Sequence, residues 1–290
     1  MAAESPSLTV DEPSVHGVSR SRIDIEPRRV GFEYEDVDSP FFYEGNPCIS
    51  AMWVSLSASF PLGEAEFIKS TRFFEDQITD EKLKEDVKNF VQQEAHHSLQ
   101  HRQVNKYFDG LGYSTSKLED FYKQELDKRA NKWSHERRLA HTVVVEHVTA
   151  VMAHYALTKK ERMAGFPESI RSLFQWHAIE EIEHKSVTFD VYQHCVGNRK
   201  LLMWAYYYFF YYEFPLNVYL SSRFLLKDMG YKVSWAERKG LWNYLNGEDG
   251  LVSSMKPLYR LFRKPGFHPW DHDDSALVAD WKQRLSPYFK

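Results

Sequence analysis

Apolar residues recur at helical spacing through most of the chain, and no segment alternates apolar and polar residues as a half-buried β-strand does. Proline, glycine and N-capping residues divide this pattern into separate segments. The segments predict helices over residues 48–77, 79–108, 116–131, 134–163, 167–197, 201–226, 234–247, 251–263 and 275–285. In the first of them, Pro61 and Gly63 predict a break or a kink. The predicted fold class is therefore all-α.

Residues 1–30 mix serine, proline, glutamate and arginine without periodicity, which is typical of a flexible tail. We expect residues 31–46 to form an extended arm and residues 31–290 to form a single helical domain. A chain of 290 residues with 43% hydrophobic residues can bury a large core. The net charge of −4 gives no reason to expect a nucleic-acid partner.

The stretch from Trp176 to Lys185 carries the most informative chemistry. His177, Glu181 and His184 stand at positions i, i+4 and i+7, which places them within an arc of about 60° on one helix face. Two imidazoles and a carboxylate that point the same way form part of a metal site, because both groups are common ligands of transition metals.

A second pair, Glu94 and His97, shows the Glu-x-x-His spacing on an earlier helix. Two such helices, with two others that each supply one further glutamate, form the centre of ferritin-like dimetal proteins. The chain offers these groups in the required order, each on its own predicted helix: Glu64, Glu94 with His97, Glu146, and Glu181 with His184. The predicted architecture is a ferritin-like four-helix bundle with additional N- and C-terminal helices.

The surroundings of the single glutamates also favour a metal. Glu146 lies within the largely apolar residues 142–153, where an unpaired carboxylate would cost several kcal/mol. Four carboxylates and two divalent cations are together neutral, so a metal pair would explain why these acids point inward. Glu66 competes with Glu64, because the two lie about 200° apart around the helix and only one can face the site.

Four motifs carry a family resemblance: Phe60-Pro61-Leu62-Gly63-Glu64, Gln93-Glu94-Ala95-x-His97-x-x-x-His101, Glu146-His147-x-Thr149-Ala150 and Trp176-His177-x-x-Glu180-Glu181-x-Glu183-His184-Lys185. In these motifs the chain resembles the family of predicted metal-dependent hydrolases, over roughly residues 28–285. The resemblance implies a ferritin-like bundle, and it favours Glu64 over Glu66 as the ligand.

The order of the ligands is also similar to that of the di-iron arylamine N-oxygenases. In those enzymes a third histidine joins the usual four carboxylates and two histidines, and His177 occupies the corresponding position here. The similarity is confined to the ligand pattern, so it implies di-iron chemistry but no substrate.

Together, these patterns predict a non-haem di-iron oxygenase or oxidase that activates O2 and oxidises a small, apolar or aromatic substrate. The expected ligands of one iron ion are Glu64, Glu94 and His97, and those of the other are Glu146, His177, Glu181 and His184. Glu94 and Glu181 are the expected bridges, and manganese or zinc could replace iron. Electrons would come from an external donor, because the chain has no flavin or nicotinamide motif.

Three other functions are compatible with the same features. A two-metal hydrolase would use the same ligands, with zinc or manganese, to activate a bridging hydroxide. A metal-free helical bundle could act as a membrane-associated or partner-binding module. Iron oxidation for storage would need an iron-entry path and usually a shell assembly.

Residues 201–212 comprise twelve uncharged residues, eight of them aromatic, before Glu213 and Pro215 interrupt the run. The run is too short to span a bilayer, although Tyr and Trp favour the membrane interface. We expect residues 201–226 to cover the bundle or to form a homodimer seam, with peripheral membrane contact as the alternative. The two cysteines and the lack of a signal-peptide pattern in the first ten residues favour a cytoplasmic location.

Two further residues could support such a site. His101 shares a helix face with Glu94 and could hold a ligand in place, and Asp190 could accept a hydrogen bond from a ligating imidazole. His268 and His272 fall in a polar stretch that we expect to be a surface turn.

Overall fold

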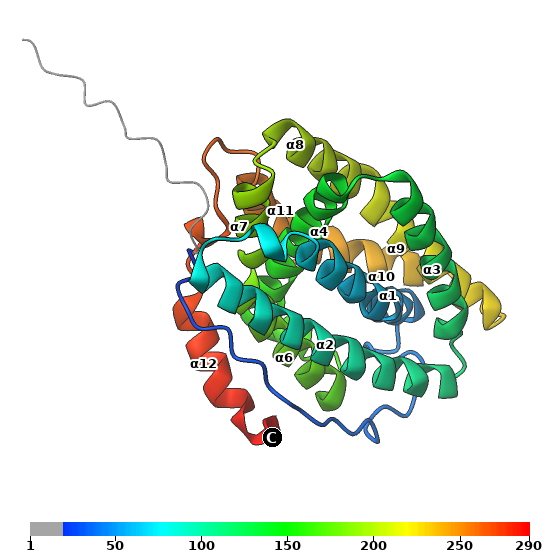
Figure 1. Cartoon of the computed structure of the whole chain (residues 1–290). Coiled ribbons are helices and arrows are strands. Elements are labelled where there is room, and N and C mark those ends of the chain that lie inside the picture. Colours follow the sequence, from blue (N-terminus) through cyan, green and yellow to red (C-terminus); the bar gives the residue numbers. More distant parts are fainter. Residues whose placement is uncertain (1–19) are drawn as a thin grey trace, which may run out of the picture.

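A computed structural model describes residues 20–290 of the protein, and most of this range is helical (Figure 1). The helices are α1 Pro47–Arg72, α2 Glu81–Gly110, α3 Thr115–Lys132, α4 His135–Thr158, α5 Lys160–Met163, α6 Glu168–His184, α7 Val187–Cys195, α8 Arg199–Tyr208, α9 Phe214–Asp228, α10 Trp235–Asn246, α11 Leu251–Leu261 and α12 Ser275–Leu285. Short turns lie at η1 Glu75–Gln77, η2 Phe209–Glu213, η3 Pro269–Asp271 and η4 Ser286–Tyr288. Within residues 20–290, extended pairing is confined to one bridge between Val30 and Phe289. The predicted all-α class is confirmed.

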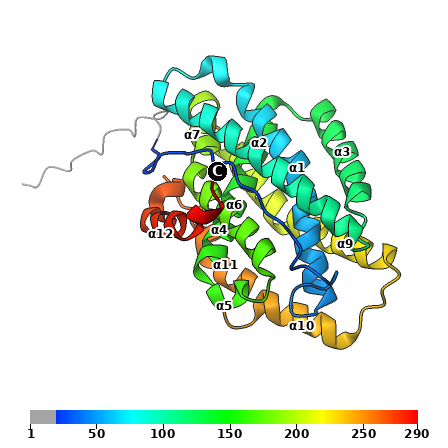
Figure 2. The same cartoon turned by 90° about the horizontal axis from the view of Figure 1, so that it is seen from below.

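Four helices form the centre of the molecule. α1 packs on α2, α2 on α6, α6 on α4 and α4 on α1, so that they enclose a common interior. Around them, α3 and α9 cover α1, α8 and α11 cover α4, and α12 covers α6 (Figures 1 and 2). This is the set of contacts that a four-helix bundle requires, while its relation to ferritin stays a prediction.

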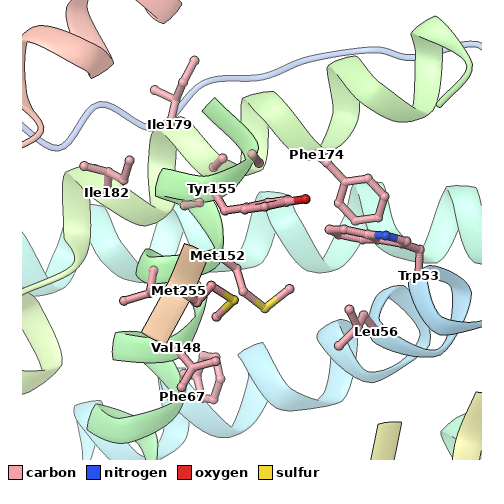
Figure 3. Packing of buried hydrophobic residues seen from close by; sticks show 14 of the residues in the cluster. Trp53, Leu56, Phe67, Val148, Met152, Tyr155, Phe174, Ile179, Ile182 and Met255 are labelled. Atoms are coloured by element: carbon pink, nitrogen blue, oxygen red, sulfur yellow. The ribbon is translucent and has the colours of Figure 1, made fainter. Parts of the chain in front are cut away.

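One half of the interior is an apolar core (Figure 3). Trp53 from α1 lies against Phe174 from α6, with ring centroids 4.7 Å apart, and Met152 and Tyr155 from α4 pack nearby. The buried indole of Trp53 donates its Nε1–H to the hydroxyl of Tyr244 at 3.0 Å. Replacing such a residue by alanine typically costs 3–5 kcal/mol, so this cluster holds the central helices in register.

α1 runs through Pro61 without the break that the sequence predicted. A proline cannot donate to the carbonyl four residues earlier, here that of Ser57. Asn105 of α2 replaces the missing donor, because its Nδ2 lies 3.1 Å from the Ser57 carbonyl oxygen. The helix can therefore continue to Arg72 and present Glu64 to the interior.

Other predicted helices are divided or shifted. α4 ends at Thr158 and α6 at His184, where we expected unbroken helices to residues 163 and 197. The cap of α2 is Asp80, whose side chain accepts from the Leu83 amide. A capping box formed by Ser234 and Glu237 opens α10.

The aromatic segment 201–226 covers the bundle, as we expected, but in two helices. Pro215 lacks an amide hydrogen, and a π turn, η2, joins α8 to α9 just before it. The inner side chains of α8 are buried, whereas Tyr207, Tyr211, Tyr212 and Tyr219 are 47%, 56%, 59% and 60% exposed. Among the described residues, no helix has both the length and the apolar character needed to cross a membrane. Peripheral membrane contact and a homodimer seam at this surface stay predictions.

The N-terminal arm, by which we mean residues 20–46, lies over α2 and α6 and is dark blue in Figure 2. We expected a flexible tail up to residue 30, yet Ile25 and Val30 are buried and Arg28 pairs with Glu183 at 2.7 Å. Packing against the helices therefore begins before the expected boundary at residue 31, because buried acids on α6 attract the arm. The remainder of the expected tail, residues 1–19, lies outside the described residues.

Candidate metal centre

The seven residues predicted as ligands converge in the interior of the four-helix ring. Their exposed fractions lie between 0% and 5%, and they are Glu64, Glu94, His97, Glu146, His177, Glu181 and His184. We call this set the buried cage. Glu66 points elsewhere and forms hydrogen bonds with Arg138 at 2.7 and 2.8 Å, so the structure agrees with Glu64 as the inward residue.

The cage contains three groups whose potential ligand atoms lie within 4.8 Å of one another, and two of them share Glu94. One of these two is Glu64, Glu94 and His97, and the other is Glu94, Glu146 and His184. Glu94 belongs to both, and its Oε1 lies 3.2 Å from His184 Nε2. Glu181 also spans them, since its two oxygens lie 3.7 Å from His97 Nδ1 and 3.6 Å from His184 Nε2. These are the two glutamates that we expected to bridge.

His177 lies on the other side of the cage from the one we assigned to it. We expected it beside Glu146 and His184, but it groups with Glu64 and His101 and with His97 and Glu181. Its ring stacks on that of His97 with centroids 4.0 Å apart. The reason is helical geometry: His177 stands almost two turns before His184 on α6, so it reaches the other end of the cage.

Many polar atoms in the cage have no hydrogen-bond partner. Both oxygens of Glu94 and of Glu146 are unpaired, as are Glu64 Oε1, His97 Nδ1 and His184 Nε2. Each such buried atom costs about 1–3 kcal/mol when it is left unsatisfied, and charged groups cost more. Oxygen and imidazole donors converging without partners fit a pair of divalent transition-metal ions. Thus the residues present match the group that the sequence predicted.

The electrostatics of the cage lead to the same conclusion. Burial, reinforced by repulsion among the glutamates, raises the pKa of Glu64 and Glu94 well above the ordinary value. Burial and repulsion from Glu181 raise the pKa of Glu146 to about 7. Without cations the cage must therefore hold protons, and metal ions would take their place.

In each of two cage glutamates, a hydroxyl group from a neighbouring helix fixes one carboxylate oxygen. Ser98 Oγ donates to Glu64 Oε2 at 2.8 Å, and Thr149 Oγ1 donates to Glu181 Oε2. Oε1 of Glu64 is then left facing the cage, while Oε1 of Glu181 faces His177. Such support of ligating carboxylates is typical of metal sites.

Gln93 orients His184, a role that we did not assign to it from the sequence. Its Nε2 donates to Glu183 Oε2 at 2.7 Å and to the Glu26 carbonyl at 3.2 Å, which fixes the direction of the amide. Gln93 Oε1 therefore accepts from His184 Nδ1 at 2.9 Å, and His184 Nε2 is left directed at the cage. The only signal in the sequence was the position of Gln93 directly before Glu94.

A chain of hydrogen bonds orients His177 in the same way. Ser57 donates to Asn105 Oδ1 at 2.6 Å, so His101 Nδ1 must donate to Ser57 Oγ at 2.9 Å. His101 Nε2 then accepts from His177 Nδ1 at 2.7 Å, because burial lowers the pKa of His101 well below the ordinary value and keeps it neutral. His177 Nε2 is left facing the cage, 2.7 Å from Glu181 Oε1. His101 thus takes the supporting position that we considered for it.

Two further acids of α6 lie outside the cage. Glu180 Oε2 lies 3.2 Å from His97 Nε2, and Glu180 Oε1 accepts from the Arg28 amide at 3.0 Å, while burial raises the pKa of Glu180 well above the ordinary value. Glu183 pairs with Arg28 at 2.7 Å and with Lys282 at 2.6 Å. The arm and α12 therefore supply the cations that Glu183 needs.

The remaining predicted supports lie elsewhere. Asp190 accepts from His268 Nε2 at 2.9 Å and does not contact a cage imidazole. His272, which we expected in a surface turn, lies beside His154 and Asp274, in a group apart from the cage. Sequence alone could not pair His272 with His154, 118 positions earlier.

The model of one protein family matches most of the chain. It is described as predicted metal-dependent hydrolase, and it covers residues 26–273. Comparison with curated proteins gives no match, and comparison with solved structures gives none either. The matched residues include every member of the buried cage.

Proposed function

The chain belongs to the family of predicted metal-dependent hydrolases, and on this premise we propose that the buried cage is the dimetal centre of a hydrolase. This reverses the order of the sequence predictions, in which a di-iron oxygenase came first. The observation that carries the proposal is the set of unpaired carboxylate and imidazole atoms that converge in the cage. A pair of divalent metals, when bound there, lowers the pKa of water and polarises a substrate oxygen.

In this proposal the cage residues divide into two overlapping sets. Glu64, Glu94 and His97 hold one ion, and Glu94, Glu146, Glu181 and His184 hold the other. The four carboxylates balance the charge of two divalent ions. Gln93 keeps His184 in the tautomer that can ligate a metal.

His177 then has a separate task, which is to hold a proton. Its Nε2 lies 2.7 Å from Glu181 Oε1, a distance at which the two atoms can share a proton released during hydrolysis. His101 supports this role by fixing the opposite nitrogen, Nδ1, as a hydrogen-bond donor. Phe60 packs edge-on against both imidazoles, with centroids 5.0 Å from His177 and 4.6 Å from His101. This contact shields the histidine pair from bulk water.

The proposal is tested by metal content together with hydrolysis of a panel of small carboxylic esters. We expect Glu146→Ala and His184→Ala to lower bound metal from two ions per chain and to abolish ester cleavage. Glu66→Gln is the matched control, because Glu66 lies on the same helix turn as Glu64 but pairs with Arg138. His177→Ala should keep both ions, lose activity by about 10²-fold or more, and alter the pH profile of kcat.

One observation favours the oxygenase as a second candidate. His177 places a third imidazole beside His97, a nitrogen-rich arrangement compatible with iron. Reconstitution separates the candidates: zinc- or manganese-loaded protein should cleave an ester in the panel, and ferrous protein should not consume O2. Ester cleavage absent with every metal, together with O2 uptake by the ferrous protein, would replace the hydrolase by the oxygenase.

A further inference from the structure

A second group of potential metal ligands lies outside the buried cage. His154 of α4 meets His272 and Asp274 of the loop before α12, and we call these three residues the outer triad. Glu146 and His154 are eight residues apart on α4, which is about 12 Å along the helix, so the two sites are separate. The side chains of His154 and His272 are 28% and 38% exposed, whereas that of Asp274 is 5% exposed.

The ligand atoms of the outer triad form a compact triangle. His154 Nδ1 lies 2.8 Å from Asp274 Oδ1, His272 Nε2 lies 3.1 Å from the same oxygen, and the two nitrogens are 3.4 Å apart. A tetrahedral zinc ion with bonds of about 2.0–2.1 Å separates neighbouring ligand atoms by about 3.4 Å. The triangle would have to open by about half an ångström on its shortest side, and by about half as much on a second side, to hold such an ion.

Lys185 fixes the carboxylate of the triad. Its Nζ lies 2.7 Å from Asp274 Oδ2 and donates to the His272 carbonyl at 2.7 Å, while the Trp270 ring centroid lies 4.1 Å from it. Oδ1 of Asp274 is thereby directed at the two imidazoles. A second contact of this kind, on the oxygen that does not ligate, is what orients carboxylate ligands in metal sites.

We propose that the outer triad binds one zinc-class divalent cation, separate from the buried cage, that fastens the C-terminal segment to α4. Two imidazoles and one carboxylate suit Zn²⁺ or a similar transition metal, and not Mg²⁺ or Ca²⁺, which prefer oxygen ligands alone. The exposed side of the triad leaves the fourth position to water. Asp271 in the same loop adds negative charge that favours a cation, whereas Asp273 is paired with Arg22 at 2.8 Å.

The bound cation would hold in place the C-terminal segment that includes α12 and lies next to the cage. Asp274 is the last residue before α12, and α12 carries Lys282, which neutralises the buried Glu183 at 2.6 Å. A cation bound to both His154 and this loop would tie α4 directly to the segment that leads into α12. Zinc bound at the triad should therefore stabilise the folded protein, because a ligand that binds only the folded state raises the free energy of unfolding by RT ln(1 + [L]/Kd).

The test is a titration of the full chain, with its cage metals in place, using Zn²⁺ and then Co²⁺ as probes. We expect the wild type to bind one equivalent beyond the cage metals and to rise in Tm on zinc addition. His154→Ala and His272→Gln should weaken this equivalent at least tenfold and lose the rise in Tm. His135→Ala is the matched control, because His135 is an exposed histidine that stacks on Phe73 and belongs to no ligand group among the described residues.

His272→Gln keeps a hydrogen-bond donor for Asp274 but has no imidazole, so it separates ligation from simple hydrogen bonding. Its Tm without zinc should stay close to that of the wild type. The proposal is wrong if the wild type takes up no further equivalent, or if both variants take it up as tightly as the wild type does. Metal in the cage is counted in the same samples, so failure of the outer triad is distinguishable from failure of the dimetal proposal.

Discussion

The buried cage and the outer triad use the same kinds of ligand in opposite surroundings. In the cage, both oxygens of Glu94 and of Glu146 lack any hydrogen-bond partner. In the outer triad, Asp274 accepts from His154 and pairs with His272 and Lys185. Water reaches the exposed imidazoles of the triad but not the cage. Burial without partners means that the cage must take up either cations or protons, whereas the partly exposed and paired ligands of the triad need neither.

The largest difference between the two sites should be in how much their bound metal stabilises the folded protein. Removal of all metal by a chelator is expected to lower Tm by on the order of 10 °C, because the ligand-linked stabilisation of tightly bound ions amounts to about 4 kcal/mol. The measurement is thermal unfolding before and after chelation. In the His272→Gln variant the drop should be almost as large, since most of it comes from the cage. An equal Tm with and without metal would show that the cage is stable with protons alone.

A smaller effect is expected from the residues that orient the cage imidazoles. Gln93→Leu removes the acceptor of His184 Nδ1 while keeping a side chain of similar size. Metal affinity should fall by about 10- to 100-fold, the usual result of losing such a partner. Competition with a metal-binding dye measures it. Gln92→Leu, at the exposed neighbouring position, is the control and should bind metal as the wild type does.

The smallest effect should come from a buried acid that the protein neutralises without metal. Glu213 pairs with Arg129 at 2.7 Å and with His141 at 2.9 Å. Burial opposes its ionisation, but contacts with His141 and Arg129 prevail and lower its pKa to about 2. A lowered pKa contributes stability that is present above the unfolded value of about 4.5 and is lost as the pH falls toward 2.

We therefore expect Glu213→Gln to cost on the order of 1 kcal/mol at neutral pH, with the difference from the wild type shrinking between pH 4.5 and 2. Urea unfolding across this pH range measures it. Chelation should lower the free energy of unfolding of the wild type and of Glu213→Gln by the same amount. A dependence on metal would mean that Glu213 is coupled to the cage, contrary to its separate ion pairs.

The sequence by itself determined the all-α class and the composition of the buried cage. Side chains at i, i+3, i+4 and i+7 share a helix face whatever the helix packs against, so the pairs Glu94 with His97 and Glu181 with His184 were fixed locally. The largely apolar residues 142–153 placed Glu146 in the interior, where the cost of an unpaired carboxylate indicated a cation. Both arguments depend on short stretches of chain, which is why they could be made without coordinates.

Only the tertiary structure decided how the helices meet. It placed His177 beside His97, gave His184 its partner Gln93, and let Asn105 cap the carbonyl that Pro61 leaves free. It also brought His154 to residues of the C-terminal loop more than a hundred positions away. Such contacts depend on the rotation and offset of whole helices, which side-chain packing over the entire core sets and which no local pattern in the sequence encodes.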